Sequence, residues 1–174
     1  MGISCINWHR VVARVGAYLL LLSILLMAFW IRVQSRGDIP EGQFTGTDAY
    51  LYYWLANIIS VEGDLPELDM DRWVPLGRDL EETLPFYAYV LAYFHKGISL
   101  FFPEVSLYSI VLFAPVFCFM LGLGGLCLYL YRTFGLIFAW IVGIILTTLP
   151  GTILRSTAGF SDRDSWCFLL GISQ

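Results

Sequence analysis

The chain is dominated by three long runs of residues without charge. Each run is bounded by charged side chains, and the runs cover residues 15–31, 106–131 and 133–154. At a rise of about 1.5 Å per residue, the two longer runs cross a hydrocarbon core of about 30 Å, and the first is just long enough. We therefore predict membrane-spanning helices at residues 15–31, 106–131 and 136–154, with a short turn at residues 132–135.

The two ends of the chain need separate interpretation, since the first run could be a signal peptide and the last residues begin another apolar segment. The first run follows a basic lead, as a signal peptide does, but no small-x-small cleavage site comes after it. We therefore interpret it as an uncleaved anchor behind a cytoplasmic tail at residues 1–14. Residues 166–174 begin a fourth apolar helix that is too short to span. From this we expect the chain to be the N-terminal part of a longer protein.

A long polar segment, residues 32–105, separates the first two predicted spans and holds every Asp and Glu except Asp162 and Asp164. Two spans lie between this segment and a second loop at residues 155–165, so both loops emerge on the same side of the membrane. Acidic side chains far apart in the sequence can therefore meet at one membrane surface. Because short, purely basic segments favour the cytoplasmic side, we expect the acidic loops to face the periplasm, the exterior or an organelle lumen.

Two helices are expected within the long polar segment. Residues 47–60 predict a helix with Thr47 as its N-cap and an acid in the first turn, where a negative charge suits the helix dipole. Residues 82–102 predict an amphipathic helix lying in the membrane interface, because His95 and Lys96 interrupt the apolar run. The stretch between the two helices is rich in Pro, Gly and Asp, which indicates irregular structure.

Composition supports a membrane protein and excludes several other classes. The chain is 58% hydrophobic and only 14% charged, which is too little charge to cover the surface of a soluble domain. Its cysteines show neither a disulfide framework nor zinc-ligand spacing, and no basic patch suggests a nucleic-acid partner. We therefore predict an all-α polytopic membrane protein, in contact with membrane lipids, with a long and partly helical first external loop.

Four polar residues are candidates for chemistry. Asp162 and Asp164 would face one centre in an extended segment, and carboxylate oxygens suit Mg²⁺ or Mn²⁺; the alternative is an ordinary polar loop before a helix. Asp48 is a candidate third carboxylate, or it only stabilises the helix that it starts. Arg155 is a candidate to orient carboxylates or to meet a phosphate, or it only extends to the membrane interface.

Three ordered motifs change the weight of these alternatives. "GTDAY" follows the first span, "DRWVPLGRDLEETLPF" lies later in the same loop, and "RSTAGFSDRDSW" follows the third span. In order and position they resemble the membrane-embedded catalytic subunit of oligosaccharyltransferase, the STT3, AglB and PglB family, from residue 15 onward. The family's G-x-D motif matches residues 46–48. Its second acidic motif, with a preceding arginine, matches Arg155, Asp162 and Asp164.

The resemblance implies a function, a GT-C-type fold and a set of roles. Family members transfer an oligosaccharide from a polyprenyl or dolichyl (pyro)phosphate donor to the side-chain amide of Asn in Asn-X-Ser/Thr of an acceptor polypeptide. It implies that Asp48 binds the metal and hydrogen-bonds the acceptor amide. It implies further that Asp162 and Asp164 complete the site for Mn²⁺ or Mg²⁺, and that Arg155 supports it.

Full-length family members are longer and add a further acid and an acceptor-reading domain, so we expect this chain of 174 residues to be inactive without the C-terminal part of its own polypeptide.

Two other readings of the function remain beside this one. One alternative is another GT-C glycosyltransferase that uses a polyprenyl phosphate donor and modifies Ser, Thr or a lipid. The other is a non-catalytic membrane or transporter fragment whose acids are merely solvated.

Overall fold

The computed structural model of this chain describes residues 8–72, 74–80 and 85–172, with no side chain described for residues 8–10. Expectations that fall on residues 1–7, on Trp73 and residues 81–84 of the loop motif, and on residues 173–174 lie outside the described residues.

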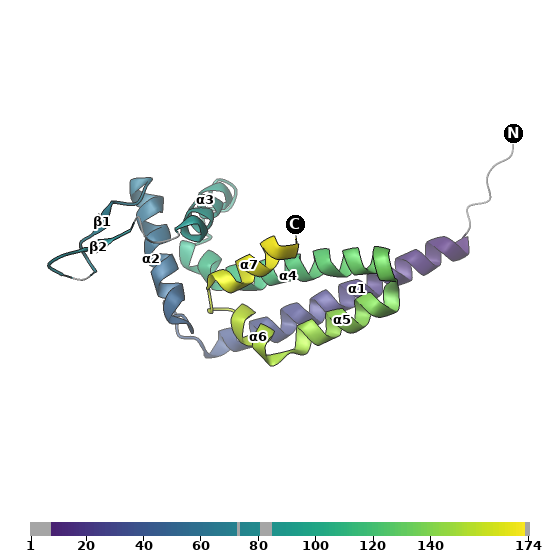
Figure 1. Cartoon of the computed structure of the whole chain (residues 1–174). Helices are drawn as coiled ribbons and strands as arrows, with labels where there is room; N and C mark the ends of the chain where they lie inside the picture. Colours follow the sequence, from purple (N-terminus) through teal and green to yellow (C-terminus); the bar gives the residue numbers. More distant parts are fainter. Residues whose placement is uncertain (1–7, 73, 81–84, 173–174) are drawn as a thin grey trace, which may run out of the picture.

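Three long apolar helices form the body of the structure. They are α1 (Trp8–Val33), α4 (Leu107–Phe134) and α5 (Leu136–Thr148), and they lie side by side along most of their length (Figure 1). Among the described residues, two helical segments are each long and apolar enough to cross a membrane: Val11–Asp38, which includes most of α1, and Leu107–Phe134, which is α4. A third span follows if α5 and the short helix α6 (Pro150–Ser156) count as one. About 74% of the described residues are helical, so the expected all-α membrane fold is confirmed.

The third span is broken, whereas we expected one continuous helix over residues 136–154. α5 and α6 meet at an angle of 65°. Leu149 is extended there, because the ring of Pro150 disfavours the helical conformation in the residue before it. Pro150 also has no N–H to donate to the carbonyl oxygen of Leu146. The hydroxyl of Thr152 donates to that oxygen instead, at 2.6 Å.

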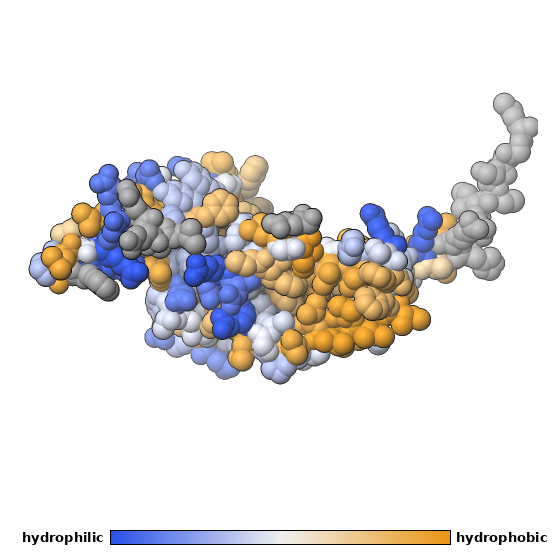
Figure 2. Space-filling view, in the orientation of Figure 1, coloured by the Kyte–Doolittle hydropathy of each residue, from blue (hydrophilic) through white to orange (hydrophobic). Residues whose placement is uncertain are grey.

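The surface of the bundle is apolar as well as its core. Ile24, Phe119 and Leu123 pack in the interior, while Leu19 and Ile137 are largely exposed on the outside. Figure 2 shows apolar residues gathered over the bundle and hydrophilic residues over the opposite end of the molecule. Large exposed apolar side chains on helices of this length are what a lipid environment requires.

A second group of helices lies across the polar end of the bundle. α2 (Thr47–Glu62) and α3 (Phe86–Ser99) pack against each other and against α4 around a shared core that contains Tyr52 and Tyr87. The 14 residues of α3 extend over about 21 Å, which is shorter than a hydrocarbon core. Between α2 and α3, β1 (Leu68–Asp69) pairs antiparallel with β2 (Arg78–Asp79).

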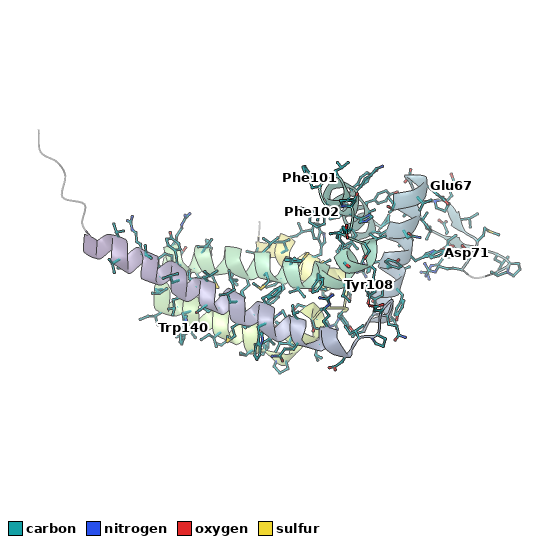
Figure 3. The ribbon with its side chains drawn as sticks, turned by 180° about the vertical axis from the view of Figure 1, so that it is seen from behind. Glu67, Asp71, Phe101, Phe102, Tyr108 and Trp140 are labelled. Carbon is teal, nitrogen blue, oxygen red and sulfur yellow. The ribbon has the colours of Figure 1, made fainter. Side chains whose placement is uncertain are left out.

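The positions of a few side chains show which parts of the chain lie at each end of the molecule. Glu67 and Asp71 lie at the end that carries the β1–β2 ladder, Phe101 and Phe102 project from the loop after α3, and Trp140 lies on the bundle (Figure 3). A short 3-10 helix, η1 (Gln34–Asp38), connects α1 to the polar end, and α7 (Arg163–Ile172) runs back along α4 (Figure 1). The loops that carry the candidate acids therefore lie where the bundle meets its polar end.

Candidate active site

Gly159 joins the two loops that carry the candidate acids. Its carbonyl oxygen accepts hydrogen bonds from the backbone N–H groups of Thr45 and Gly46, with N···O distances of 3.1 and 3.4 Å. Its own N–H donates to the carbonyl oxygen of Leu112 in α4, at 2.9 Å. Gly159 has a φ of 87°, in the left-handed region that favours glycine. One residue thus ties the start of α2, the loop after α6 and the helix α4 together.

Gly46 allows the same two loops to approach closely. A Cβ atom at this position would lie 3.1 Å from a carbon of the Phe160 ring. Gly46 is also the residue before α2, which begins at Thr47, so Thr47 is not the N-cap that we expected. Asp48 lies in the first turn of α2. The glycine of the G-x-D sequence therefore brings the helix that carries Asp48 against the loop that carries Asp162.

Asp48 and Asp162 line one small cavity of about 40 Å³. Its other walls come from the first turn of α2 and from the loop between α6 and α7; they are Gly46, Thr47, Ala49, Phe160 and Ser161. A space of this size holds a small ion or one to two water molecules. The structure therefore brings together two of the predicted site residues, one from before α4 in the sequence and one from after α5.

Asp162 is the buried member of the pair. Its residue surface is only 9% exposed, and its Oδ1 atom accepts a hydrogen bond from the backbone N–H of Arg163 at 2.6 Å. Burial raises the pKa of Asp162, and the negative charges of Asp164 and Asp48 raise it further, against the lowering effect of that N–H and of the Arg163 side chain. A carboxyl group with a raised pKa beside two other acids is an environment that favours a bound cation.

Arg155, in the last turn of α6, reaches both acids of the second loop. Its Nη1 atom lies 2.5 Å from Oδ2 of Asp164 and 3.8 Å from Oδ2 of Asp162. The carbonyl oxygen of Arg155 also accepts a hydrogen bond from the hydroxyl of Ser165, at 2.9 Å. The Arg155 side chain is 59% exposed, so its charge stays accessible to solvent and to a ligand.

The expected extended geometry of Asp162 and Asp164 is wrong. α7 begins at Arg163, so Asp164 lies in its first turn and Asp162 precedes it. The two-residue alternation of a strand does not hold across a helix start. The carboxylate of Asp164 pairs with Arg155 and does not join Asp48 at the cavity lining.

A preformed metal site with three protein ligands is absent from the described part of the chain. No group of three or more His, Cys, Asp or Glu side chains lies close enough there to hold an ion. The pairing of Arg155 with Asp164 accounts for this, because it directs one of the three candidate carboxylates to a guanidinium. Asp48 and Asp162 remain as a pair. Mg²⁺ is commonly bound by one or two carboxylates together with water and substrate phosphate, so the pair fits that ion.

Two tyrosines at the site, Tyr87 and Tyr52, were not predicted from the sequence. The hydroxyl of Tyr87 in α3 lies 2.9 Å from the hydroxyl of Ser161, next to Asp162, and the Tyr87 side chain is buried. Burial raises the pKa of Tyr87, so its hydroxyl stays neutral and able to hydrogen-bond. The ring of Tyr52 in α2 packs edge-on against it, with ring centres 5.0 Å apart. In the sequence, Tyr87 stands in an apolar aromatic run, where nothing distinguishes it from a packing residue.

Comparison with known proteins identifies the family. The family model described as "Oligosaccharyl transferase STT3, N-terminal" matches residues 17–173. The chain belongs to the STT3 family. A search of curated proteins finds no match. Together with helices long enough to cross a membrane, membership of the STT3 family makes this chain an integral membrane protein with a role of the oligosaccharyltransferase type.

Proposed function

We propose that this STT3-family chain supplies part of the catalytic site of an enzyme for asparagine-linked glycosylation. The enzyme transfers an oligosaccharide from a polyprenyl or dolichyl (pyro)phosphate lipid to the side-chain amide of Asn in Asn-X-Ser/Thr. The observation that carries the proposal is the convergence of Asp48 and Asp162 on one cavity at the polar end of an apolar bundle. This end faces the periplasm, the exterior or an organelle lumen, where the acceptor polypeptide arrives.

Asp48 is the residue that we assign to the acceptor amide. An amide nitrogen is a poor nucleophile because its lone pair is conjugated with the carbonyl group. A carboxylate that accepts the amide hydrogens favours a geometry in which this conjugation is weakened. Asp48 is exposed at the edge of the cavity, so an acceptor side chain can reach it.

Asp162 and Arg155 provide the fixed charges of the site. Oδ1 of Asp162 is engaged by the N–H of Arg163, while Oδ2 lies 3.8 Å from the Arg155 guanidinium and is free to take a closer ligand. Arg155 compensates the charge of Asp164 through its 2.5 Å contact. Its exposed guanidinium also suits a phosphate oxygen of the lipid donor.

Mg²⁺ or Mn²⁺ fits the donor chemistry of these residues. Asp48 and Asp162 would hold the ion, and Asp164 is the additional carboxylate nearby. When bound, such an ion supplies Lewis-acid stabilisation to the departing pyrophosphate. The raised pKa of Asp162 is consistent with this role, because a cation would relieve the repulsion among the three acids.

The proposal is tested in the full-length membrane protein, reconstituted with a lipid-linked oligosaccharide and an Asn-X-Thr peptide. Asp48→Asn and Asp162→Asn are each expected to lower the rate of glycopeptide formation by at least about 10²-fold, as loss of metal-site groups does. The matched control is Asp38→Asn, because Asp38 is an exposed acid of η1 that does not line the cavity. It should leave the rate unchanged.

Two outcomes would replace the proposal with one of its alternatives. Transfer to Ser, Thr or lipid acceptors, and none to the Asn peptide, would indicate another glycosyltransferase that uses a polyprenyl phosphate donor. Full activity of Asp48→Asn and Asp162→Asn, without dependence on Mg²⁺ or Mn²⁺, would indicate that these acids are merely solvated.

A further inference from the structure

Arg32 is an arginine that the structure buries completely, although it stands at the end of an apolar helix. Its exposed fraction is 0%, and it lies in the last turn of α1. Arginines at the ends of membrane helices usually extend toward water. Burying a guanidinium is unfavourable unless its N–H groups find acceptors. The partners of Arg32 therefore indicate what the residue does.

The side chain of Arg32 holds the broken third span. Its Nη1 atom donates to the carbonyl oxygen of Thr147 at 3.3 Å, and its Nε atom donates to the hydroxyl of Ser156 at 2.6 Å. In a continuous helix, the N–H of Gly151 would bond the Thr147 oxygen. The break at Pro150 leaves that oxygen at the negative end of α5, where a positive charge is favourable. Arg32 thus bonds both α5 and α6 across the bend.

The backbone of Arg32 holds the residues that come next. Its carbonyl oxygen accepts hydrogen bonds from the N–H of Ala158, at 3.0 Å, and from the hydroxyl of Thr157, at 3.1 Å. The hydroxyls of Ser35 and Thr157 also lie 2.9 Å apart. The end of α1 therefore fixes three consecutive residues, 156–158, through one side-chain contact and two backbone contacts.

The Arg32 side chain also reaches α7 indirectly, through Phe119 of α4. Its guanidinium carbon lies 3.7 Å from the centre of the Phe119 ring, and Phe119 stacks on Phe168 with ring centres 5.2 Å apart. Phe168 is one helical turn after Asp164 in α7. The contacts of Arg32 thus reach both sides of the second acidic loop.

We propose that Arg32 is a positioning residue for the candidate active site. By holding the bend between α5 and α6 and residues 156–158, it fixes Arg155 on one side and Gly159 and Asp162 on the other. It touches neither a substrate nor a reacting atom. Its effect on activity rests on the proposed function, whereas its effect on geometry can be measured separately.

Activity is measured with the full-length protein and the assay described above. Arg32→Met keeps much of the side-chain length but removes the donors, and it should lower turnover by about 10²-fold, the loss typical of a misplacement of about 1 Å. Arg32→Lys should retain more activity, because it keeps a charge but not the planar donor group. Arg14→Met, an exposed change at the other end of α1, is the control and should behave as the parent does. KM for the acceptor peptide should change much less than turnover.

The geometry is measured by crosslinking Ser35→Cys to Thr157→Cys in the full-length protein with its native cysteines replaced, including the four in these 174 residues. The pair should oxidise readily with Arg32 present and several-fold more slowly in Arg32→Met. Oxidation of the Arg32→Met chain should restore part of its turnover, because the disulfide replaces the lost restraint.

Two results would overturn the inference: unchanged turnover in Arg32→Met, or lost turnover with an unchanged crosslinking rate. If the parent shows no glycosyl transfer while crosslinking depends on Arg32, the proposed function fails and the structural role of Arg32 stands.

Discussion

Gly159 connects both acidic loops, so its replacement by alanine tests the architecture of the site directly. At φ 87°, an alanine costs about 1–2 kcal/mol relative to glycine. Its Cβ atom would lie 2.9 Å from the Cδ1 atom of Ile39 and 3.3 Å from the hydroxyl oxygen of Thr45. Because the end of the Ile39 side chain can move, we add only about 1 kcal/mol for this overlap. The expected loss of stability is therefore about 2–3 kcal/mol.

Gly151→Ala is the matched control for this change. Gly151 lies in α6, its φ is not in the left-handed region, and a Cβ atom there meets nothing within 4 Å. Alanine is favoured over glycine in a helix by up to about 1 kcal/mol, so the control should be neutral or stabilising. Unfolding of the purified protein in detergent, followed by tryptophan fluorescence, gives both values. Equal stability of the two variants, or a Gly159→Ala variant as stable as the parent, would refute the reasoning.

Two further predictions concern the surroundings of Asp162. Because its pKa is raised above the ordinary value of 3.8, its contribution to folding stability falls as pH rises from that value through the raised pKa. Binding of Mn²⁺ requires the charged form and should therefore weaken as pH falls through the raised pKa. Calorimetric titrations with Mn²⁺ at a series of pH values check this, and an affinity that does not change with pH would argue against Asp162 as a ligand. Tyr87→Phe should lower the free energy of unfolding by about 1 kcal/mol through loss of the hydrogen bond to Ser161, whereas Tyr93→Phe, an exposed change in the same helix, should have no effect. Equal denaturation midpoints for these two variants would contradict it.

The apolar helices were accessible from the sequence because their signal is local. An uncharged run of sufficient length specifies a membrane helix without knowledge of its neighbours. α4 occupies residues 107–134, close to the predicted 106–131. The convergence of Asp48 with Asp162 could be anticipated for a similar reason, since two intervening spans return the chain to the same side. Neither inference depends on side-chain detail.

The burial of Arg32 could not be predicted in this way. In the sequence it marks the charged edge of an apolar run, which suggests exposure at the interface. Its acceptors, Thr147 and Ser156, are more than a hundred residues away, and one of them becomes available only because the helix breaks. A pattern of hydrophobicity contains no information on such a contact.

The geometry of the second acidic loop was missed although a local signal was present. An Asp directly before a helix and another in its first turn are common at helix starts, and "SDRDSW" has this form. Treating the motif as extended placed both carboxylates on one face. The structure instead starts α7 at Arg163, and the separation of the two acids follows from that choice.

The break in the third span explains why Arg155 and Asp162 meet. Continued along the axis of α5, the seven residues of α6 would advance by about 10 Å. Bent by 65°, the same residues advance by about 4 Å and move sideways by about 9 Å, and α6 then contacts α1, α4 and α7. The bend thus carries Arg155 across the bundle to the acids before α7, and it exposes the carbonyl oxygens that Thr152 and Arg32 satisfy. Pro150 leaves the carbonyl oxygen of Thr147 without its helical donor, and the buried guanidinium of Arg32 has N–H groups that need acceptors. The hydrogen bond between them therefore stabilises both the bend and the buried arginine.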